Sequence, residues 1–289
     1  MSVAFTGDSL ENLSDFVQQQ GTRCQFAGND SWVILSAIEQ SIKRKIEAVG
    51  TPLHDWDINI YRGVLTGYNE AFIIDTNKRD EILGNCKNED ERKRTAELIR
   101  PILRGRDIKR YGYDWANLWL INTHNGVRGR IPRIDINDYP AVKQHLDKHW
   151  DKICSRADKG DTPYNLRNCA YLDDFSKPKI IYPETTQGAY FAYDDKGLFV
   201  DKTCFMLISD DGQYLQQTLS SKLFAFAYKR IFSSVSLGEH GYQYNKHALI
   251  KLPIIKPPKR QLIDSSDIDH SIYNLYNISP EEISYIEQE

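Results

Sequence analysis

The sequence lacks the features of secreted, disulfide-bonded and membrane-spanning proteins. Its 289 residues include five cysteines, which are widely separated and never form a Cys-x-x-Cys pair, so neither a disulfide framework nor a zinc knuckle is indicated. No apolar run approaches the length of a membrane span, and the opening MSVAFTGDSLENL has neither the basic region nor the apolar stretch of a secretory signal. We expect reduced, mostly structural cysteines in a soluble, cytoplasmic protein with no membrane partner.

Motifs that support catalysis are also missing. The chain has no Gly-x-Gly turn, which a Rossmann-like sheet needs because only glycine lets the backbone approach a cofactor closely. Its one Pro-Pro pair, Pro257-Pro258, lies between two lysines and not in an Asn/Asp-Pro-Pro-aromatic loop, and no Gly-x-Ser-x-Gly motif is present. Residues 194–196 read Asp-Asp-Lys, as in metal-dependent nucleases, but the following Gly197 marks a turn. We expect no catalytic residue, metal or cofactor in this chain.

Two histidines, His145 and His149, stand four residues apart on an expected helix and could meet a metal ion from one face. The residue after His145 is Leu146, so the general base of the His-Glu-x-x-His zinc pattern is missing. Both histidines flank the apolar stripe of that helix. We therefore interpret them as half-exposed helix positions and not as metal ligands.

Charge is distributed unevenly along the chain. The formal net charge is −3, but residues 261–289 contain seven acidic side chains and no lysine or arginine, so the rest of the chain is mildly basic. One basic cluster alone would favour a solvated face, whereas two clusters with aromatic residues nearby favour a groove that follows a phosphate backbone. The first comprises Arg92, Lys93, Arg94, Arg100, Arg104, Arg106, Lys109 and Arg110, and the second comprises Lys152, Arg156, Lys159, Arg167, Lys177 and Lys179.

Apolar periodicity predicts four helices. Asn29 or Asp30 can cap the first, and Gly50 and Pro52 end it. The last is opened by Ser279 and has a capping-box pattern. The helices are expected at 31–49, with Ile34, Ile38, Ile42 and Ile46 on one stripe; at 138–158, with Pro140 in the first turn, Val142, Leu146, Trp150 and Ile153 buried and Gly160 after the end; at 213–232, with Leu215, Leu219, Leu223 and Phe226 buried; and from Pro280 onward, with Glu282 at the third position.

Short runs rich in Ile, Tyr and Phe, bounded by Gly, Asn or Asp, predict the strands of a partly buried antiparallel sheet. The turn at 194–197 predicts a hairpin between the last two runs. Because strands and helices do not alternate regularly, we predict an α+β fold with a mixed, mainly antiparallel sheet, packed helices and an N-terminal helix. The runs lie at 58–61, 71–75, 118–123, 179–183, 189–194 and 198–209.

Several stretches, in their order and spacing, resemble one protein family. They are GVLTGYNEAF at 63–72, LIRPILRGRDIKRYGY at 98–113, RADKGDTPYNLRNCAY at 156–171, KPKIIYPETT at 177–186 and LPI at 252–254. Together they are similar to the C-terminal target-recognition region of TaqI-like adenine-specific DNA methyltransferases. The same region occurs in type IIG restriction-modification enzymes and resembles half of a type I specificity subunit. Members carry a methyltransferase domain ahead of this region, and the motifs of that domain are absent here.

The resemblance implies a DNA target-recognition domain at 51–260. A helical segment at 1–50 would precede it as a candidate connector to a methyltransferase, and an acidic tail at 261–289, ending in a short helix, would follow it. The implied partners are double-stranded DNA and a methyltransferase subunit or domain, with a nuclease as a further candidate. That partner would bind S-adenosylmethionine and methylate a flipped adenine.

Each loop motif leaves two interpretations open. Gly63 and Gly67 bracket a turn that either contacts DNA or only sets the geometry of the sheet. Two arginines after a helix ended by Pro101 can make bidentate contacts with phosphate or guanine, unless Asp107 fixes one of them in a structural pair. The loop at 158–167 presents basic and aromatic tips, and the polar residues at 185–187 either read base edges or only satisfy a turn.

We predict a specificity module of a restriction-modification system, which recognises duplex DNA without chemistry of its own. One alternative is a non-catalytic assembly or regulatory subunit, or a remnant, that binds a methyltransferase but not DNA. Another is a separately encoded portion of a split methyltransferase. The recognition surface is expected to be one concave face on which basic and polar tips converge. The predicted DNA-binding residues are Arg104, Arg106, Lys109, Arg110, Arg156, Lys159, Tyr164, Arg167, Lys177, Lys179, Thr185, Thr186 and Gln187.

Overall fold

The computed structural model describes residues 35–233, 241–257, 263 and 267–288. The helices in these residues are α2 (Ala37–Val49), α3 (Asn69–Phe72), α4 (Thr76–Gly84), α5 (Glu89–Leu98), α6 (Pro140–Asp147), α7 (Trp150–Ser155), α8 (Gly212–Leu219), α9 (Lys222–Ala227), α10 (Lys246–Leu249), α11 (Ile268–Leu275) and α12 (Pro280–Gln288). The strands are β1 (Thr51–Pro52), β2 (Asn59–Arg62), β3 (Ile73–Asp75), β4 (Ile99–Leu103), β5 (Ile108–Lys109), β6 (Gly112–Tyr113), β7 (Leu118–Ile121), β8 (Lys179–Pro183), β9 (Thr185–Thr186), β10 (Ala192–Asp194), β11 (Phe199–Val200), β12 (Cys204–Ile208), β13 (Tyr242–Gln243) and β14 (Pro253–Ile254).

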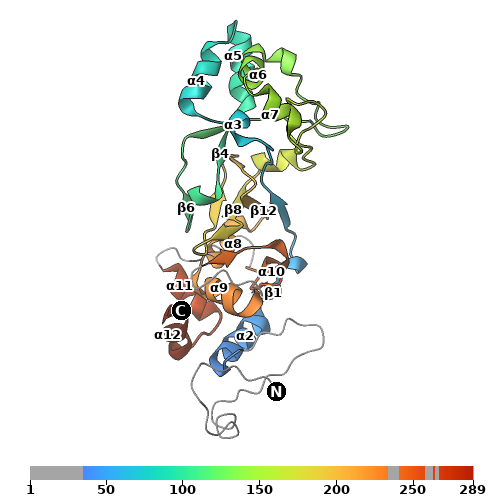
Figure 1. The fold of residues 1–289 in the computed structure, drawn as a ribbon. Helices are drawn as coiled ribbons and strands as arrows, with labels where there is room; N and C mark the ends of the chain where they lie inside the picture. The colour runs from blue at the N-terminus through green and yellow to red at the C-terminus, as the bar shows by residue number, and fades with distance from the viewer. Residues whose placement is uncertain (1–34, 234–240, 258–262, 264–266, 289) are drawn as a thin grey trace, which may run out of the picture.

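The molecule is elongated, with helices at both ends and strands between them (Figure 1). Helices α4 to α7 gather at one end, and α2, α9, α11 and α12 gather at the other. None of the helices in the described residues has the length and apolar character that crossing a bilayer requires.

The central element is an antiparallel sheet with the strand order β10-β8-β12-β2. All residues of β8 are buried, because both faces of this sheet are covered. Side chains alternate between the faces of a strand, so Ile180 and Tyr182 enter one hydrophobic cluster while Ile181 enters another. The same alternation sends Leu207 of β12 to the first cluster and Met206 to the second. The sheet therefore separates two cores.

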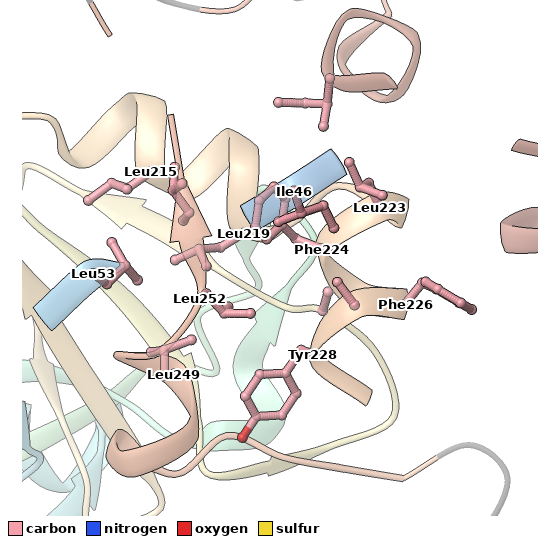
Figure 2. Packing of buried hydrophobic residues seen from close by; sticks show 14 of the residues in the cluster. Ile46, Leu53, Leu215, Leu219, Leu223, Phe224, Phe226, Tyr228, Leu249 and Leu252 are labelled. Atoms are coloured by element: carbon pink, nitrogen blue, oxygen red, sulfur yellow. The ribbon is translucent and has the colours of Figure 1, made fainter. Parts of the chain in front are cut away.

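The first core joins this sheet to helices from both ends of the sequence. Figure 2 shows Ile46 of α2 among Leu219, Leu223 and Phe224 of α8 and α9. Ile272 of α11 and Ile286 of α12 enter the same core. The expected boundaries at residues 50 and 260 remain a prediction, although the helices beyond both of them pack into this one core.

The second core lies under a mixed sheet with the order β11-β4-β7-β3, in which β11 runs parallel to β4 and the other pairs are antiparallel. Phe72, Val142 and Leu146 pack against it from α3 and α6. Antiparallel pairs dominate both four-stranded sheets, and helices cover them. The predicted α+β class, with a mainly antiparallel mixed sheet, is confirmed.

Capping explains the helix ends that the sequence predicted well. Ser279 and Glu282 form the expected capping box of α12, with each side chain accepting from the backbone N–H of the other. Helix α2 begins at Ala37 behind a capping box formed by Ser36 and Glu39, later than the expected start. The proposed caps Asn29 and Asp30, and also Ile34, lie outside the described residues.

Three expected helices or strands are interrupted. The predicted helix 138–158 breaks after Asp147 and restarts at Trp150, whose side chain is 44% exposed and not buried. The predicted helix 213–232 is broken where Ser221 caps α9, and it ends in a π-helical turn at Tyr228–Phe232. The first half of the expected strand 71–75 belongs to α3, because Ala71 and Phe72 continue a helical turn.

Two further expectations are wrong. Gly197 does take the positive φ of a turn, but β10 pairs with β8 and β11 pairs with β4, so no hairpin forms across 194–197. Pro101 does not end a helix: α5 ends at Leu98, and Pro101 lies in β4 opposite Trp119. The sequence interpretation missed α4, α5 and α11, whose apolar stripes are short.

Gly63, in the first resemblance motif, allows a close backbone approach. A Cβ at Gly63 would lie 2.0 Å from the carbonyl oxygen of Asp201. The neighbouring Val64 N–H donates to Val200 O at 2.7 Å. We predict that Gly63→Ala lowers the free energy of unfolding by about 1–3 kcal/mol because the two segments must separate. Urea denaturation measures this loss, and Gly84→Ala is the control because a Cβ there meets nothing within 4 Å; equal stability of the two variants would contradict the packing argument.

Candidate functional site

The ends of four strands meet at one edge of the central sheet. Because β12 is antiparallel to both neighbours, its first residues pair with the last residues of the other strands, Cys204 with Pro183 and Phe205 with Arg62. The parallel pair β11-β4 matches Val200 with Leu103, so the loop that follows β4 lies beside the segment that leads into β12. Topology alone therefore gathers four loops that are distant in the sequence.

These loops surround a cavity of about 1010 Å³, which we call the central cavity. Two residues of the 63–72 motif complete its wall. Five cationic side chains and two carboxylates are among its lining residues, an excess of positive charge that attracts polyanions. The lining comprises Arg62, Leu65, Asn69, Arg104, Gly105, Arg106, Ile108, Lys109, Glu184, Thr185, Thr186, Gln187, Tyr190, Asp201, Lys202 and Thr203.

Arg104 is held by a bidentate pair. Its Nε and Nη2 donate to the Asp107 carboxylate at 3.1 and 2.9 Å, and its backbone N–H donates to the same group at 2.9 Å. Asp107 is 5% exposed. Of the two interpretations of this motif, the structural pair therefore describes Arg104, and its guanidinium is less available for an external anion than that of Arg106.

A short hydrogen-bond chain fixes the Arg104–Asp107 loop to the next loop. The Gly105 N–H donates to Thr203 Oγ1 at 2.8 Å, and that hydroxyl donates to Asp201. Burial raises the pKa of the Asp201 carboxyl, while its hydrogen bonds with Thr203 act in the opposite direction. The cavity wall is thus held in place by polar contacts and not by apolar packing alone.

Other lining side chains face solvent. Arg106, Lys109 and Lys202 are exposed, and none of them forms an ion pair with any residue that the structure describes. Thr185 and Gln187 are also exposed. The backbone around Thr185 is fixed by the pairing of β9 with β13, in which Thr186 lies opposite Tyr242. Uncommitted cations and amide or hydroxyl groups on a fixed backbone can bind phosphates and base edges.

Arg156 has a structural position. Its guanidinium donates to four carbonyl oxygens, those of Thr66, Asp158, Pro163 and Asn165. The side chain is 6% exposed and its guanidinium lies 4.3 Å from the centre of the Phe72 ring. Burial lowers the pKa of Arg156 to about 10. The prediction that Arg156 contacts DNA is therefore wrong for this conformation: it ties the 63–72 motif to the 156–167 loop.

Lys179 and Arg110 are also committed elsewhere. Lys179 is fully buried, and its Nζ donates to Phe175 O at 2.6 Å and pairs with Asp194. Arg110 binds both carboxylate oxygens of Asp269 at 2.8 Å. Lys179 is inaccessible to DNA and its prediction is wrong, because both faces of β8 are covered and all of its residues are buried. Arg110 links the β5–β6 hairpin to α11.

The remaining predicted residues lie on other loops. Lys159 Nζ donates to Cys154 O, Arg167 pairs with Asp158 at 3.1 Å, and the Tyr164 hydroxyl donates to Asp147. Lys177 pairs with Asp174 at 2.6 Å. Six predicted residues line the central cavity: Arg104, Arg106, Lys109, Thr185, Thr186 and Gln187. The other seven do not line this cavity, so the expected convergence on one concave face is wrong for them, and a role in DNA binding remains a prediction for all of the residues except Arg156 and Lys179.

Sequence reasoning missed other residues of the cavity. Lys202 and Thr203 fall inside the run 198–209, which was expected to be one strand but divides into β11 and β12. Arg62 lies at the end of β2, where its side chain pairs with Glu184. Asn69 accepts a hydrogen bond from Thr66. The Asp-Lys pair at 201–202 was the available signal, because aspartate and, less strongly, lysine are depleted in strands.

The histidines belong to the scaffold. His145 is buried, with Nε2 2.9 Å from the Ala71 carbonyl oxygen, so the expectation of half exposure is wrong for this residue. Burial lowers its pKa. Among the described residues, no group of three or more His, Cys, Asp or Glu side chains is placed to hold a metal ion.

Residues 100–254 match the protein family described as the TaqI-like C-terminal specificity domain. The chain is 23% identical over 277 residues, 89% of its length, to the Type II methyltransferase M.PaeR7I of Pseudomonas aeruginosa, of which it covers 45%. It is also 23% identical over 128 residues, 41% of its length, to the Type II methyltransferase M.BanIII of Aneurinibacillus aneurinilyticus, of which it covers 21%. The chain therefore spans less than half the length of these relatives. The resemblance carried by the motifs is confirmed.

The fold is similar to part of a solved structure, that of the Type IIL restriction-modification enzyme MmeI in complex with DNA. The TM-score is 0.52, the identity is 15%, and the similarity covers 82% of this chain and 32% of that protein. At this identity the likeness concerns the architecture alone, and it agrees with the α+β class.

The Arg156 clamp can be tested by stability. We predict that Arg156→Lys lowers the free energy of unfolding by about 2–4 kcal/mol, because one ammonium cannot satisfy four buried carbonyl groups. Urea denaturation with a far-ultraviolet circular dichroism readout measures the difference. Arg167→Lys is the matched control, since that side chain is 59% exposed and has a single ion pair; its expected effect is within about 0.5 kcal/mol. A neutral Arg156→Lys would exclude the clamp as a stabilising element.

Proposed function

The chain belongs to the family of TaqI-like C-terminal specificity domains, and on this premise we propose that it recognises a specific sequence of duplex DNA as the specificity module of a restriction-modification system. The observation that carries the proposal is the central cavity, in which four loops present uncommitted cations beside exposed polar side chains. No catalytic residue of its own takes part in the proposed function.

We assign the phosphate contacts to Arg106, Lys109 and Lys202, which form no ion pair among the described residues. Lys109 Nζ donates to Arg106 O at 3.1 Å, which leaves its charge unpaired. Long, exposed side chains can reach the phosphate backbone of the DNA whatever its base sequence. The release of condensed counterions from the DNA drives this step. Arg104 and Arg62 instead pair with Asp107 and Glu184, so their role is to set the shape of the cavity wall. Arg62, Arg104 and Arg106 all line the cavity. Arg62 and Arg104 are already paired with a carboxylate, and Arg106 is not.

We assign base recognition to Thr185 and Gln187. Both follow β8 directly, and the pairing of β9 with β13 restrains the backbone that carries them. An amide such as that of Gln187 can contact the N6 and N7 atoms of adenine at once, and a hydroxyl can accept from or donate to several base edges. A restrained backbone lowers the entropy lost when these side chains are ordered by DNA.

The chemistry of the system would belong to a partner. The relatives M.PaeR7I and M.BanIII are named as methyltransferases, and this chain covers less than half of each. We propose that a methyltransferase subunit or domain binds S-adenosylmethionine and methylates an adenine in the DNA that this chain selects. Such a complex would work in the cytoplasm, where the DNA is.

Selection from a randomised duplex library, followed by titration of the selected DNA with the 289-residue chain, tests DNA recognition. Arg106→Glu should weaken binding and reduce the slope of log K against log salt concentration by about 1, because one phosphate contact is lost. Arg44→Glu on α2 is the control, since Arg44 is exposed and does not line the central cavity. An unchanged slope for Arg106→Glu would remove this residue from the interface. Failure of the chain to enrich any sequence, together with capture of a methyltransferase, would favour the assembly-subunit alternative.

Gln187 gives a second, independent prediction. Gln187→Ala should relax the preference at one base pair by about 1–3 kcal/mol while leaving the salt slope unchanged, because a base contact releases no counterion. Comparison of the sequences selected by the variant and by the wild type measures the change. The control is Gln144→Ala, an exposed glutamine on α6. Identical selected sequences for the wild type and Gln187→Ala would refute the assignment.

A further inference from the structure

A second basic element lies outside the central cavity, in the turn formed by residues 124–134. Val127 and Ile131 exchange two backbone hydrogen bonds of 2.9 Å each, which close a tight hairpin. Gly126 and Gly129 take φ values of 72° and 77°, which glycine adopts without strain. A Cβ on Gly126 would lie 2.5 Å from Ile131 O, whereas one on Gly129 would meet nothing within 4 Å. The base of the turn is therefore packed and its tip faces solvent.

The turn carries three arginines and no acidic residue. Two of them are held: Arg130 pairs with Asp173 at 3.4 Å, and Arg133 pairs with Asp161 at 3.3 Å. Arg128, at the tip, is exposed and has no ion pair or hydrogen-bonded side chain within the described residues. The two pairs consequently fix the turn, and Arg128 is the charge left to meet an external anion.

A recess accompanies Arg128. It has a volume of about 600 Å³ and is lined by Asn125, Gly129, Arg133 and Asn168 among others. Asn125 is already engaged there, because its Nδ2 donates to Asp161 at 3.0 Å and to Asn168. The positive charge of Arg128 and Arg133 suits a phosphate group, which accepts several hydrogen bonds and carries negative charge. Asp161 also lines the recess but is paired with Arg133.

Buried polar contacts join this turn to the central cavity. Asn165 is 2% exposed, and its Nδ2 donates to His124 O at 3.4 Å and to Ile134 O at 3.0 Å, at the two ends of the turn. The Arg156 guanidinium donates to Asn165 O at 2.6 Å and also to Thr66 O. Thr66 lies between Leu65 and Asn69, which line the cavity. The turn thus stands in a fixed position relative to the cavity.

From these contacts we infer that Arg128 is a second point of contact with DNA, binding a backbone phosphate outside the base pairs that the central cavity reads. The inference rests on the proposed function. Phosphate contacts fix the register and orientation of a protein on the duplex, and a cation held on a rigid turn at a fixed position from the reading loops serves that purpose. In this proposal Arg128 adds affinity and not sequence preference, because a phosphate contact carries no sequence information directly.

The experiment titrates the selected DNA duplex with the full chain carrying Arg128→Ala or Arg128→Glu. With Arg128→Ala, binding at about 0.1 M salt should weaken about eightfold and the salt slope should fall by about 1, as one counterion fewer is released. Arg128→Glu should weaken binding further, Arg128→Lys should bind nearly as the wild type does, and Arg44→Ala is the control. Thermal unfolding of each variant checks that the fold is intact, and the exposed position of Arg128 leaves no packing to disturb.

Each outcome either supports or rejects the proposed contact between Arg128 and a DNA phosphate. A reduced slope with unchanged selected sequences supports the phosphate contact. A reduced slope with altered base preference overturns it in favour of base reading by Arg128. An unchanged slope for Arg128→Ala, when Arg106→Glu lowers the slope, rejects the second contact and leaves the proposed function standing. Absence of any sequence-selective binding by the wild-type chain rejects both.

Discussion

The arrangement of this protein depends on one sheet whose two faces are both buried. Alternation along β8 and β12 sends neighbouring side chains into separate cores, so neither strand can shift register by one residue without exchanging the contents of the two cores. That register fixes which residues stand at the ends of the strands. The central cavity exists because the antiparallel neighbours of β12 end where β12 begins and because β11 runs beside β4.

The polar scaffold around the cavity uses charge in two ways. Arg104, Arg156 and Lys179 bind carboxylate or carbonyl oxygens within the protein, and a buried charge without such partners would be very costly. Arg106, Lys202 and Arg128 remain exposed without ion pairs in the described chain. Both groups consist of arginine and lysine, so residue type alone does not distinguish them. Only the position of each residue relative to the cores and to neighbouring acceptors separates a structural cation from one able to bind an anion.

Much of the fold followed from local pattern, and the rest did not for physical reasons. The α+β class, the capping box at Ser279 and the buried stripe of α8 and α9 depend on neighbours close in sequence, and they were predictable. The pairing of β11 with β4 depends on residues nearly a hundred positions apart, and the turn at 194–197 gave no sign of it. Likewise the motifs identified the loops at 104–109 and 185–187, whereas the burial of Arg156 and Lys179 is decided by tertiary packing that local pattern does not contain.

The walls of the central cavity come mainly from loops, two-residue strands and the end of β2, whereas the two cores occupy the faces of the longer strands. Side chains such as those of Thr185, Gln187 and Arg106 are exposed, so exchanging them alters the lining without disturbing apolar packing. Under the proposed function, a lineage could acquire a new target site through a few changes in these connections while the architecture stays constant. By contrast, substitution of Gly63 or Arg156 would lower the free energy of unfolding, whichever DNA sequence is recognised.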